Sequence, residues 1–440
     1  MSSRSRRLVL PFAALAIAAL ALTGCSTSAG AQPDAAGTAD GVVKIEGPLI
    51  GQDATRLEQS WAGWEKANHI RIEYTGSANF QENIGSEAQQ GNAPDLAIFE
   101  QPGLINDLAT RGYIRKLPTS VDTTVTKTFP AQWAGYTTVK GADYGAPLLS
   151  SLNGWIFYSP SAFAKLDQKV PTTWAQLLTL TEYLRAGSNT APWCEGFDSN
   201  ATSGSVGASF VDDLVLRQSG TAVYDQWVDH TIPFNDPRIT QAFSAAGQIL
   251  QNRDWVNASF GDVKSINKTT SSDVAKALES GQCDLSYESS SFLDQLKTSS
   301  DGVETVSPQG QIWAFLLPAM NGGATPITQS GDFVAAFSTD ADTVKVQNYL
   351  ASLSWAKSRM KLGGAISPAT AITPSDTPDN LLNASVALVQ GGATDSRLSA
   401  ADVMPSIVGE GTYLSGIVNW INGKSISSVT STIDGSWPKS

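Results

Sequence analysis

Two hydrogen-bonding side chains, Glu100 and Gln101, stand directly after the apolar run that begins at Leu96 and directly before a Pro-Gly turn. A Gly/Asn/Pro break precedes the run, so the pattern predicts a buried parallel strand that ends at a ligand cleft. A carboxylate and an amide at such a strand end supply the paired acceptors and donors that ligand hydroxyl groups need. Any α/β sheet contains such strands, so the alternative is that Glu100 simply faces water.

Patterns that carry enzymatic chemistry are missing from the sequence. Gly423-Lys424-Ser425 lacks the first glycine of a phosphate-binding loop because position 418 is Val, and neither Gly-x-Ser-x-Gly nor His-Glu-x-x-His occurs. The two histidines, His69 and His230, leave little room for acid/base catalysis or for a Cys/His metal site. No cofactor and no metal are therefore expected.

Acidic residues are the remaining candidates for catalysis, since a glycosidase needs only two carboxyl groups at a suitable separation. The candidates are Asp212, Asp213, Asp225, Asp229 and Asp236. Carboxylates are common on solvated helix faces, and we interpret these five in that way.

The chain has twelve tryptophans. Apolar sugar faces stack on aromatic rings, so Trp together with Glu, Asp, Asn and Gln near strand ends is what a carbohydrate site requires. Trp61 and Trp64 fall on one stripe of a predicted helix and are expected in the core. Trp155 and Trp193 stand beside a link and a Pro-x-Cys turn, and are the better candidates for ligand contact.

Residues 1–24 have the order of an export signal. Arg4, Arg6 and Arg7 precede an uncharged run, 8–22, which is too short to span a bilayer comfortably, and Leu22-Thr23-Gly24-Cys25 follows. Small residues before a cysteine resemble the bacterial lipobox, in which the chain is cut before the cysteine and the cysteine is lipidated. We expect anchoring through Cys25 to the outer face of the cytoplasmic membrane, with a flexible tether over 25–41. An ordinary signal peptide with an incidental cysteine is the alternative.

Lipidation of Cys25 leaves Cys194 and Cys283 as the remaining cysteines. Disulfides persist outside the cytoplasm, so we predict that these two are bridged, with two unrelated buried thiols as the alternative.

The formal net charge is −12, and removal of the basic leader makes the mature chain more acidic. An acidic surface argues against nucleic acid as a partner. No later segment has eighteen consecutive apolar residues, so the anchor is the only membrane attachment expected.

Hydrophobic periodicity predicts alternating strands and helices in the first part of the chain, which makes a βαβαβ unit with right-handed crossovers. Strands are expected at 42–45, 70–74, 96–99, 144–149, 155–158, 312–317 and 331–337. Helices are expected after Asp53, after Asn79, and at 103–111, 211–217, 238–251, 272–280 and 414–421. The polar segment 150–154 is read as a flexible link between two lobes, with later crossings at 321–329 and 366–368. Ligands of such sheets bind outside the carboxyl ends of the strands.

Five segments in series resemble a family-1 extracellular solute-binding protein of an ABC sugar importer, and most closely its α-glucoside-binding branch. The segments are Ala93–Gly103, Phe157-Tyr158-Ser159-Pro160, Val170-Pro171-Thr172-Thr173-Trp174, Ala191-Pro192-Trp193-Cys194 and Val223-Tyr224-Asp225-Gln226-Trp227. The resemblance covers essentially the whole mature chain. It implies a periplasmic-binding-protein fold, in which two α/β lobes joined by three hinge segments close on a sugar around a central cleft.

The resemblance also implies domains and site residues. The N-terminal lobe would comprise 42–150 and 323–368, and the C-terminal lobe 151–322 and 369–440. Ligand contacts carried over are Gln52, Ser77, Asn79, Glu100, Gln101, Asn153, Trp155, Trp193, Glu195, Glu288, Ser289 and Asp332. The chain departs from the α-glucoside branch at Asn153, where that branch tends to have Lys, and at 284–288. Both departures lie where ligand is expected, so they bear on which sugar is bound.

These observations lead to one expected function and two alternatives. We expect a monomeric, lipid-anchored binding protein that delivers a neutral di- or trisaccharide to ABC permease subunits. The alternatives are an anchored glycoside hydrolase, and a binding protein for a non-sugar solute or a sensory partner. A basic cluster, which an acidic or phosphorylated sugar would need, is not visible.

Overall fold

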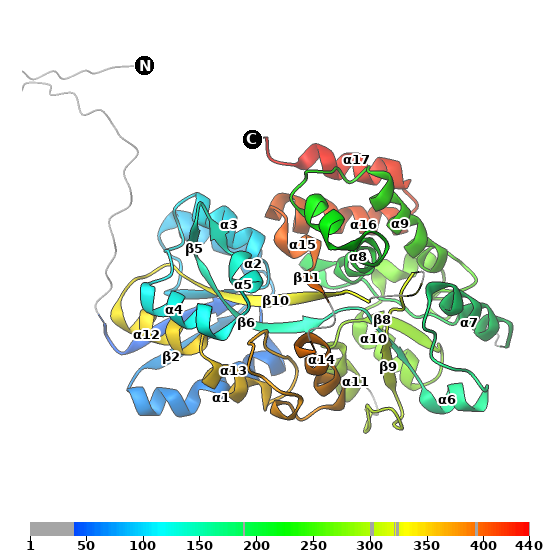
Figure 1. Ribbon diagram of the computed structural model, residues 1–440, viewed down its shortest axis with the longest axis horizontal. Helices are drawn as coiled ribbons and strands as arrows, with labels where there is room; N and C mark the ends of the chain where they lie inside the picture. The colour runs from blue at the N-terminus through cyan, green and yellow to red at the C-terminus, as the bar shows by residue number, and fades with distance from the viewer. Residues whose placement is uncertain are drawn as a thin grey trace, which may run out of the picture. The chain divides into compact units, whose positions relative to one another are not determined.

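The computed structural model describes residues 39–187, 190–299, 303–320, 322, 325–391 and 395–439, and Ala35–Ser440 form one compact unit (Figure 1). The expected leader 1–24, the lipidation site Cys25 and most of the tether lie outside the described residues. Gly41, expected at the end of the tether, is hydrogen-bonded to the folded part of the chain. Its carbonyl accepts a hydrogen bond from the Arg71 amide at 2.8 Å, and its amide donates one to Asp342 at 3.1 Å.

The strands and helices alternate along much of the chain. The strands are β1 Val42–Gly47, β2 Arg71–Gly76, β3 Leu96–Phe99, β4 Thr138–Val139, β5 Ala142–Asp143, β6 Gly145–Leu152, β7 Trp155–Tyr158, β8 Leu285–Glu288, β9 Trp313–Leu316, β10 Ile327–Ala336 and β11 Ser396–Leu398. The α-helices are α1 Gly51–Asn68, α2 Phe80–Gln90, α3 Pro102–Thr110, α4 Thr119–Thr128, α5 Ala131–Gly135, α6 Pro160–Lys165, α7 Trp174–Gly187, α8 Ser205–Val228, α9 Pro237–Leu250, α10 Ser271–Glu279, α11 Phe292–Thr298, α12 Ala341–Leu350, α13 Leu353–Met360, α14 Asn380–Gln390, α15 Ala400–Val403, α16 Leu414–Ile421 and α17 Ile426–Ser436. Short 3-10 turns lie at Asn200–Thr202, Val263–Lys268 and Pro374–Asp376, and a π-helical turn at Ile407–Tyr413.

The larger sheet has six strands in the order β11-β10-β3-β1-β2, with β6 paired to β10. Strand β1 runs parallel to β2 and β3, so the predicted βαβαβ unit is confirmed. Strand β10 is antiparallel to both β3 and β6, a reversal that the βαβαβ pattern did not indicate. The core of this sheet is made by the apolar residues of the predicted strands, with Val43, Ile45 and Leu96 fully buried.

The segment 150–154, predicted to be a flexible link, is mostly strand. Strand β6 continues through Leu152 and pairs with β10, so only Asn153 and Gly154 separate it from β7. Ser150 is buried, and its hydroxyl donates to the Gln329 side chain at 2.8 Å. The prediction was wrong because small polar side chains in a paired strand satisfy one another across the ladder and need no loop.

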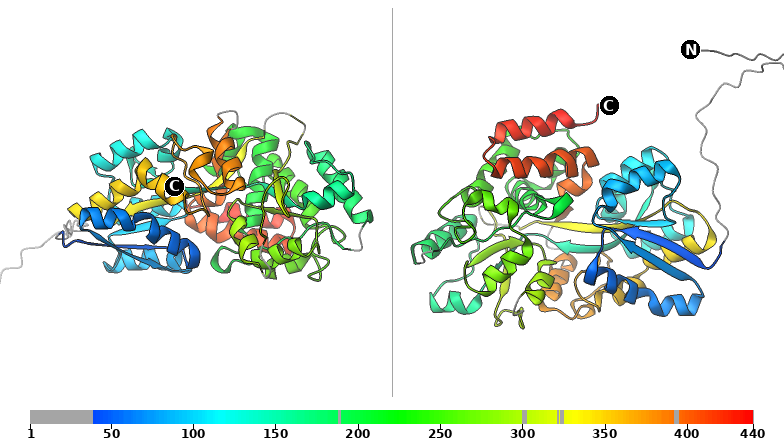
Figure 2. Two further views of the ribbon diagram at one scale, coloured as in Figure 1. Left: turned by 90° about the horizontal axis from the view of Figure 1, so that it is seen from below. Right: turned by 180° about the vertical axis from the view of Figure 1, so that it is seen from behind.

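The smaller sheet, β8-β7-β9, is buried on both faces. Alternate residues of β7 enter two different hydrophobic cores: Trp155 and Phe157 belong to the core that includes α10 and α11, while Ile156 and Tyr158 belong to the core that includes α8, α9 and α16. This is the period-two alternation of a strand between two layers. Figure 2 shows the C-terminal helices, coloured red, beside the green helices of the second layer.

The predicted disulfide is present. Cys194 and Cys283 are bridged, with their Cα atoms 5.8 Å apart and a sequence separation of 89. The bridge joins the segment after Pro192 to the start of β8, next to the hydrogen bond from the Cys194 amide to the Leu285 carbonyl.

Helix α8 carries Asp212 and Asp213, which were predicted to be solvated and are instead fully buried. Asp212 accepts hydrogen bonds from Ser399, from the Ala400 amide and from the Tyr413 hydroxyl. The prediction failed because a sequence does not show that other parts of the chain supply donors to a buried carboxylate.

The Asp213 carboxylate interacts with hydrogen-bond donors from three parts of the chain. It accepts from the Tyr287 hydroxyl at 2.9 Å and from the amide and hydroxyl of Thr328 at 3.2 and 3.0 Å, and the Arg217 guanidinium lies 2.9 Å away. A Cβ on Gly154, which has φ +82°, would meet the Asp213 carboxylate at 2.4 Å. One buried carboxylate therefore touches both places where the chain passes between the two sheets.

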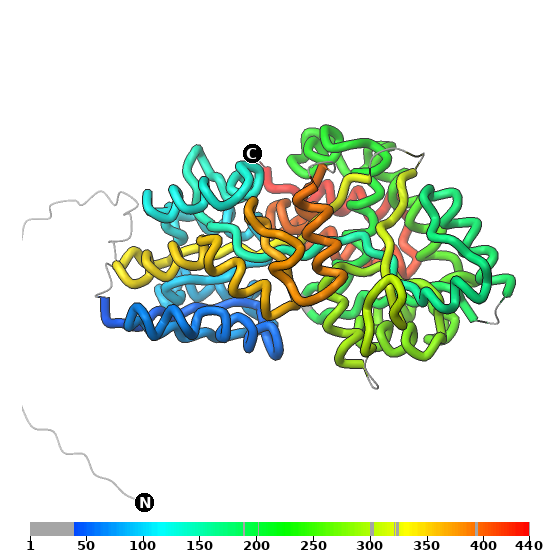
Figure 3. The backbone as a smooth tube through the Cα atoms, turned by 60° about the horizontal axis from the view of Figure 1, so that its bottom comes forward, coloured from blue at the N-terminus to red at the C-terminus, as the bar shows by residue number. Residues whose placement is uncertain are grey.

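The C-terminal part of the chain contributes one strand to the larger sheet. Strand β11 pairs in parallel with β10 and so joins the six-stranded sheet, although its residues fall in the segment 369–440 that was assigned to the other lobe. In Figure 3 the segment around α14, coloured orange, lies between the blue N-terminal elements and the green ones. Among the described residues, no helix is both long and apolar enough to cross a membrane.

Candidate functional site

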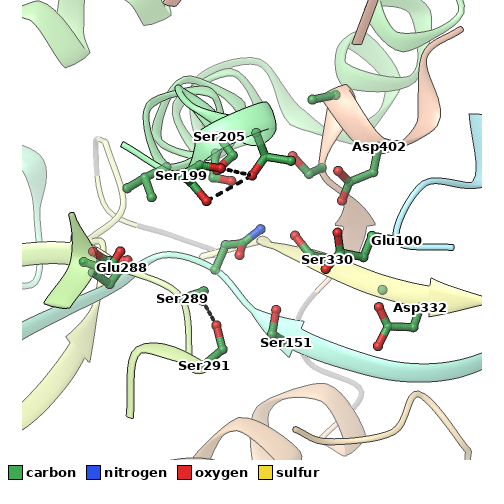
Figure 4. Close-up of a pocket in the computed structure, with 18 of the residues that line it drawn as sticks. Glu100, Ser151, Ser199, Ser205, Glu288, Ser289, Ser291, Ser330, Asp332 and Asp402 are labelled. Carbon is green, nitrogen blue, oxygen red and sulfur yellow. Dashed lines mark hydrogen bonds between the residues drawn. The ribbon is translucent and has the colours of Figure 1, made fainter. Parts of the chain in front are cut away.

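A cavity of about 380 Å³ lies between the ends of the larger sheet and strand β8 of the smaller one (Figure 4). Serine hydroxyls form much of its wall: Ser150, Ser151, Ser199, Ser205, Ser209, Ser271, Ser289, Ser291, Ser330 and Ser399. Carboxyl groups come from Asp53, Glu100, Asp198, Glu288, Asp332 and Asp402, and one guanidinium comes from Arg359. The two aromatic residues in this lining, Phe197 and Tyr287, are each only 1% exposed. The wall therefore offers hydrogen bonds and no open aromatic platform.

Glu100 and Gln101 reach the cavity because β3 ends at Phe99. Glu100 accepts a hydrogen bond from the Gln81 side chain at 3.2 Å. Gln101 is 5% exposed, and its side-chain oxygen has no hydrogen-bond partner among the described residues. Glu100 and Gln101 thus bring a carboxylate and an unpaired amide oxygen to the same wall.

Asp332 reaches the cavity through a β-bulge in β10. The register with β6 shifts between Gly331 and Phe333, so the residue between them leaves the regular ladder. A Cβ on Gly331 would lie 2.4 Å from the ring of Trp133, and this close approach is why the position before Asp332 is glycine. In Figure 4 Asp332 lies on the same side of the cavity as Glu100, Ser330 and Asp402.

Glu288 faces the cavity from the opposite side, at the end of β8, with Ser289 directly after it. Glu288 is 4% exposed, and its Oε1 has no partner among the described residues; the side-chain nitrogen of Asn153, 3% exposed, is equally unpaired. Buried polar atoms that lack protein partners are what a ligand with several hydroxyl groups would satisfy.

Burial shifts the pKa values of ionisable side chains on this wall. Burial, followed by the nearby Glu100, raises the pKa of Asp332 to about 8, and burial raises the pKa of Glu288 to about 8. Burial also raises the pKa of Asp402 well above its usual range, opposed by a hydrogen bond from Ser330. For Arg359, burial lowers the pKa. Burial therefore favours the protonated form of three carboxyl groups on this wall, those of Glu288, Asp332 and Asp402.

One ion pair joins helices α1 and α11 beside the cavity, next to the lining residues Asp53 and Gly364. Arg56 on α1 donates to both carboxylate oxygens of Asp294 on α11, at 2.5 and 2.9 Å, and also to Asp53 at 3.3 Å. Arg56 is 8% exposed. A Cβ on Gly364 would meet the Arg56 guanidinium at 2.2 Å, so this pair is enclosed by backbone.

The structure brings half of the predicted site residues to the cavity: Glu100, Gln101, Asn153, Glu288, Ser289 and Asp332. Gln52, Ser77 and Asn79 do not line it, although Gln52 adjoins the lining residue Asp53 and the Ser77 hydroxyl accepts from the Asn79 amide. These three lie on the entries to α1 and α2.

Trp155, Trp193 and Glu195 lie in the interior instead of on the cavity wall. Trp155 is 4% exposed and belongs to the core, and Trp193 is fully buried with its ring nitrogen donating to Thr181 at 3.0 Å. Fully buried Glu195 accepts the Tyr287 amide at 2.9 Å and so braces β8. The chain segments around these three residues are polar, as predicted, but the three side chains point into the protein interior.

Several lining residues escaped sequence reasoning. The serines carried no spacing signal, and Asp402 lies in a distant C-terminal segment that only the fold brings to β3. Ser330 was findable, because it directly precedes Gly331 and Asp332 in a predicted strand.

The sequence is similar to proteins of known class over most of its length. The model of the bacterial extracellular solute-binding protein family matches residues 50–356. An osmoprotective compounds-binding protein of Synechocystis sp. is 32% identical over 401 residues, covering 90% of this chain and 92% of its own. An alpha-glucosides-binding periplasmic protein of Rhizobium meliloti is 26% identical over 413 residues, covering 89% of this chain and 86% of its own.

Solved structures share the fold at low identity. The bacterial solute receptor AcbH, which prefers β-D-galactopyranose, has a TM-score of 0.75 at 17% identity, covering 90% of this chain and 97% of its own. The acarbose-binding receptor GacH of Streptomyces glaucescens has a TM-score of 0.69 at 14% identity, covering 90% and 99%. The predicted periplasmic-binding-protein fold is confirmed, and the protein binds solute without being an enzyme. By its sequence, its fold and its cavity, this chain belongs to the bacterial extracellular solute-binding protein family.

Proposed function

We propose that this protein is the lipid-anchored substrate-binding subunit of an ABC importer, and that it captures an uncharged polyhydroxylated solute in the cavity between its sheets. The solute class is a small glycoside, either an α-glucoside of two or three sugar units or an osmoprotective glycoside. The two relatives named for such compounds support this class. One lobe would comprise 42–150 and 323–368, and the other 151–322 and 369–440. The two lobes would close on the solute by a hinge motion, and the permease would recognise the closed, solute-bound form.

The observation that carries the proposal is the set of unpaired buried polar atoms on the cavity wall. Gln101 Oε1, Asn153 Nδ2 and Glu288 Oε1 have no partners among the described residues, and serine hydroxyls surround them. An unsatisfied buried polar group costs about 1–3 kcal/mol, which a ligand hydroxyl recovers. A serine-rich wall without an exposed aromatic ring favours a ligand held by its hydroxyl groups rather than by stacking.

A thermal-shift screen tests the solute class. The panel is maltose, trehalose, sucrose, raffinose and glucosylglycerol, with inorganic phosphate and glycine as solutes of other chemistry. A ligand at a hundredfold its dissociation constant adds about 2.7 kcal/mol of stability, which raises the melting temperature. A shift with phosphate or glycine and none with the glycosides would contradict the proposal.

A matched pair of variants ties a hit to this cavity. Asn153→Ala removes a buried amide from the wall, and we expect it to weaken binding about tenfold, whereas Asn235→Ala, an exposed amide outside the cavity, leaves binding unchanged. Equal effects of both substitutions would place the site elsewhere.

The proposed anchor rests on the leader and Cys25 and needs its own test. In bacterial cells that process lipoproteins, the unaltered protein is expected in the membrane fraction with acyl label, and Cys25→Ser in the unlabelled released fraction. Release of the unaltered protein would contradict anchoring.

A further inference from the structure

Carboxyl groups outnumber cations among the residues that line the cavity. Six carboxyl groups and one guanidinium lie among its lining residues. Asp198 is exposed and Asp53 pairs with Arg56, but a carboxylate that is both buried and unpaired is costly unless a bound cation or a proton neutralises it. Among the described residues, no group of three His, Cys, Asp or Glu side chains is arranged to hold a metal ion.

The surroundings of Asp332 leave its carboxyl group unpaired. The charged or titratable groups that act on it are Glu100 after β3, Asp53 on α1, Tyr74 on β2 and Arg359 on α13. The cation that acts on it, Arg359, donates to the Gly363 carbonyl at 2.7 Å and lies 3.6 Å from Asp53, without an ion pair to Asp332. Within the described part of the chain Asp332 has neither a hydrogen bond nor an ion pair, while it faces the cavity.

The surroundings of Glu288 are similar, on the opposite wall. The other carboxyl group that interacts with it is Glu195, and Ser271 donates a hydrogen bond to it. No cation acts on it among the described residues, and its Oε1 is unpaired. Burial raises the pKa of both groups to about 8, in agreement with this unpaired geometry.

We propose that Asp332 and Glu288 bind the solute as neutral carboxylic acids, each donating its O–H to a ligand oxygen from opposite walls, so that binding is linked to protonation of the protein. A carboxylic acid donates one hydrogen bond and still accepts others, which suits the hydroxyl and ether oxygens of an uncharged glycoside. This inference rests on the proposed function. It also assigns the two side chains a donor role, opposite to the acceptor role of ordinary ionised carboxylates.

Two measurable consequences distinguish a carboxylic acid that donates a hydrogen bond from an ionised carboxylate that accepts one. Above pH 8 each group must take up a proton before it can donate, so affinity falls about tenfold between pH 7 and pH 9 if one group acts, and about a hundredfold if both act. An amide keeps an N–H donor and a similar shape, so Asp332→Asn and Glu288→Gln are expected to retain affinity within about threefold at pH 7 and to lose that pH dependence.

Isothermal titration calorimetry of the full mature chain provides the test, with the panel glycoside that gives the largest thermal shift as the probe. Titrations at pH 6, 7, 8 and 9 give the affinity profile. At pH 8, buffers with different ionisation enthalpies give the number of protons bound, which we expect to reach about one in total for two half-protonated groups. The exposed Glu58, outside the cavity, supplies the control Glu58→Gln, whose profile should match the unaltered protein.

The outcomes separate this inference from the function on which it rests. Binding with a flat pH profile and no proton uptake would overturn the donor role and leave the proposed function intact. Loss of affinity by tenfold or more at pH 7 in folded amide variants would show that the groups act as carboxylate acceptors. Failure of every glycoside at every pH would overturn both. The proton uptake of the unaltered protein decides the matter even if a variant does not fold.

Discussion

The ion pair between Arg56 and Asp294 should control how long the closed form holds its ligand. The guanidinium on α1 and the carboxylate on α11 make two short hydrogen bonds beside the cavity, with side chains 10% and 16% exposed. If the lobes open by a hinge, these atoms separate, so the pair stabilises the closed form alone. Its removal should therefore speed ligand release.

The magnitude follows from the burial of the pair. Exposed pairs contribute about 0.2–1 kcal/mol, whereas breaking a fully buried pair costs about 3–5 kcal/mol. A bidentate pair that is mostly buried lies between these limits, so we expect a coupling energy of about 1–2 kcal/mol. Since 1.4 kcal/mol is a factor of ten, the dissociation constant should rise about fivefold to thirtyfold, mainly through faster dissociation.

A double-mutant cycle measures this coupling. Arg56→Gln, Asp294→Asn and the double variant are compared for ligand affinity by calorimetry and for release rate by stopped-flow tryptophan fluorescence. The cycle also removes the separate contribution of Asp53, which lies 3.3 Å from Arg56. The pair Arg238 and Asp236, local to the start of α9, serves as the control and should leave affinity unchanged. A coupling energy below about 0.3 kcal/mol in affinity, with clear coupling in thermal stability, would refute the closure argument.

Three further predictions concern stability. The double variant Cys194→Ala/Cys283→Ala should lose about 4.6 kcal/mol, since the bridge closes a loop of 89 residues, and denaturant unfolding that shows under 1 kcal/mol would contradict a role in restricting the unfolded chain. Gly331→Ala should lower the melting temperature because its Cβ would lie 2.4 Å from the Trp133 ring, and a shorter partner in Gly331→Ala/Trp133→Leu should restore part of the loss. Burial raises the pKa of Asp332 to about 8, so its contribution to stability is complete below its unfolded pKa of about 4 and is lost as the pH rises through 8. Scanning calorimetry between pH 5 and 9 should show a smaller decline for Asp332→Asn, and parallel curves would count against this.

The part of the fold that the sequence predicts is the part built from local apolar patterns. Strands β1, β2 and β3 lie where Val43, Ile72 and Leu96 indicate them, because β3 is apolar and buried throughout, whereas β1 and β2 place apolar residues between charged ones. The antiparallel insertion of β10 next to β3 was not predictable, since its partner comes from more than 200 residues away and pairing leaves no local signature.

The residues of the candidate site also fall into those that the sequence predicts and those that only the fold reveals. Glu100 was found because it directly follows the end of a predicted strand, whereas Asp332 was found only because the family resemblance carried its position over. Trp155 was misplaced because a strand buried on both faces gives no indication of which side meets the ligand. Asp402 was missed because its approach to the cavity depends wholly on tertiary packing.

The contacts of Asp213 restrict how the two lobes can move relative to each other. Its carboxylate joins helix α8 to Tyr287, to Thr328 at the start of β10 and, by close approach, to Gly154 between β6 and β7. If one lobe rotates against the other while these contacts hold, the pivot passes close to this carboxylate. Displacement grows with distance from a pivot, so the pair of Arg56 and Asp294, which joins α1 to α11, should separate more than the atoms beside Gly154. Paired spectroscopic labels on α1 and α11 would then report opening with a larger amplitude than labels near Gly154.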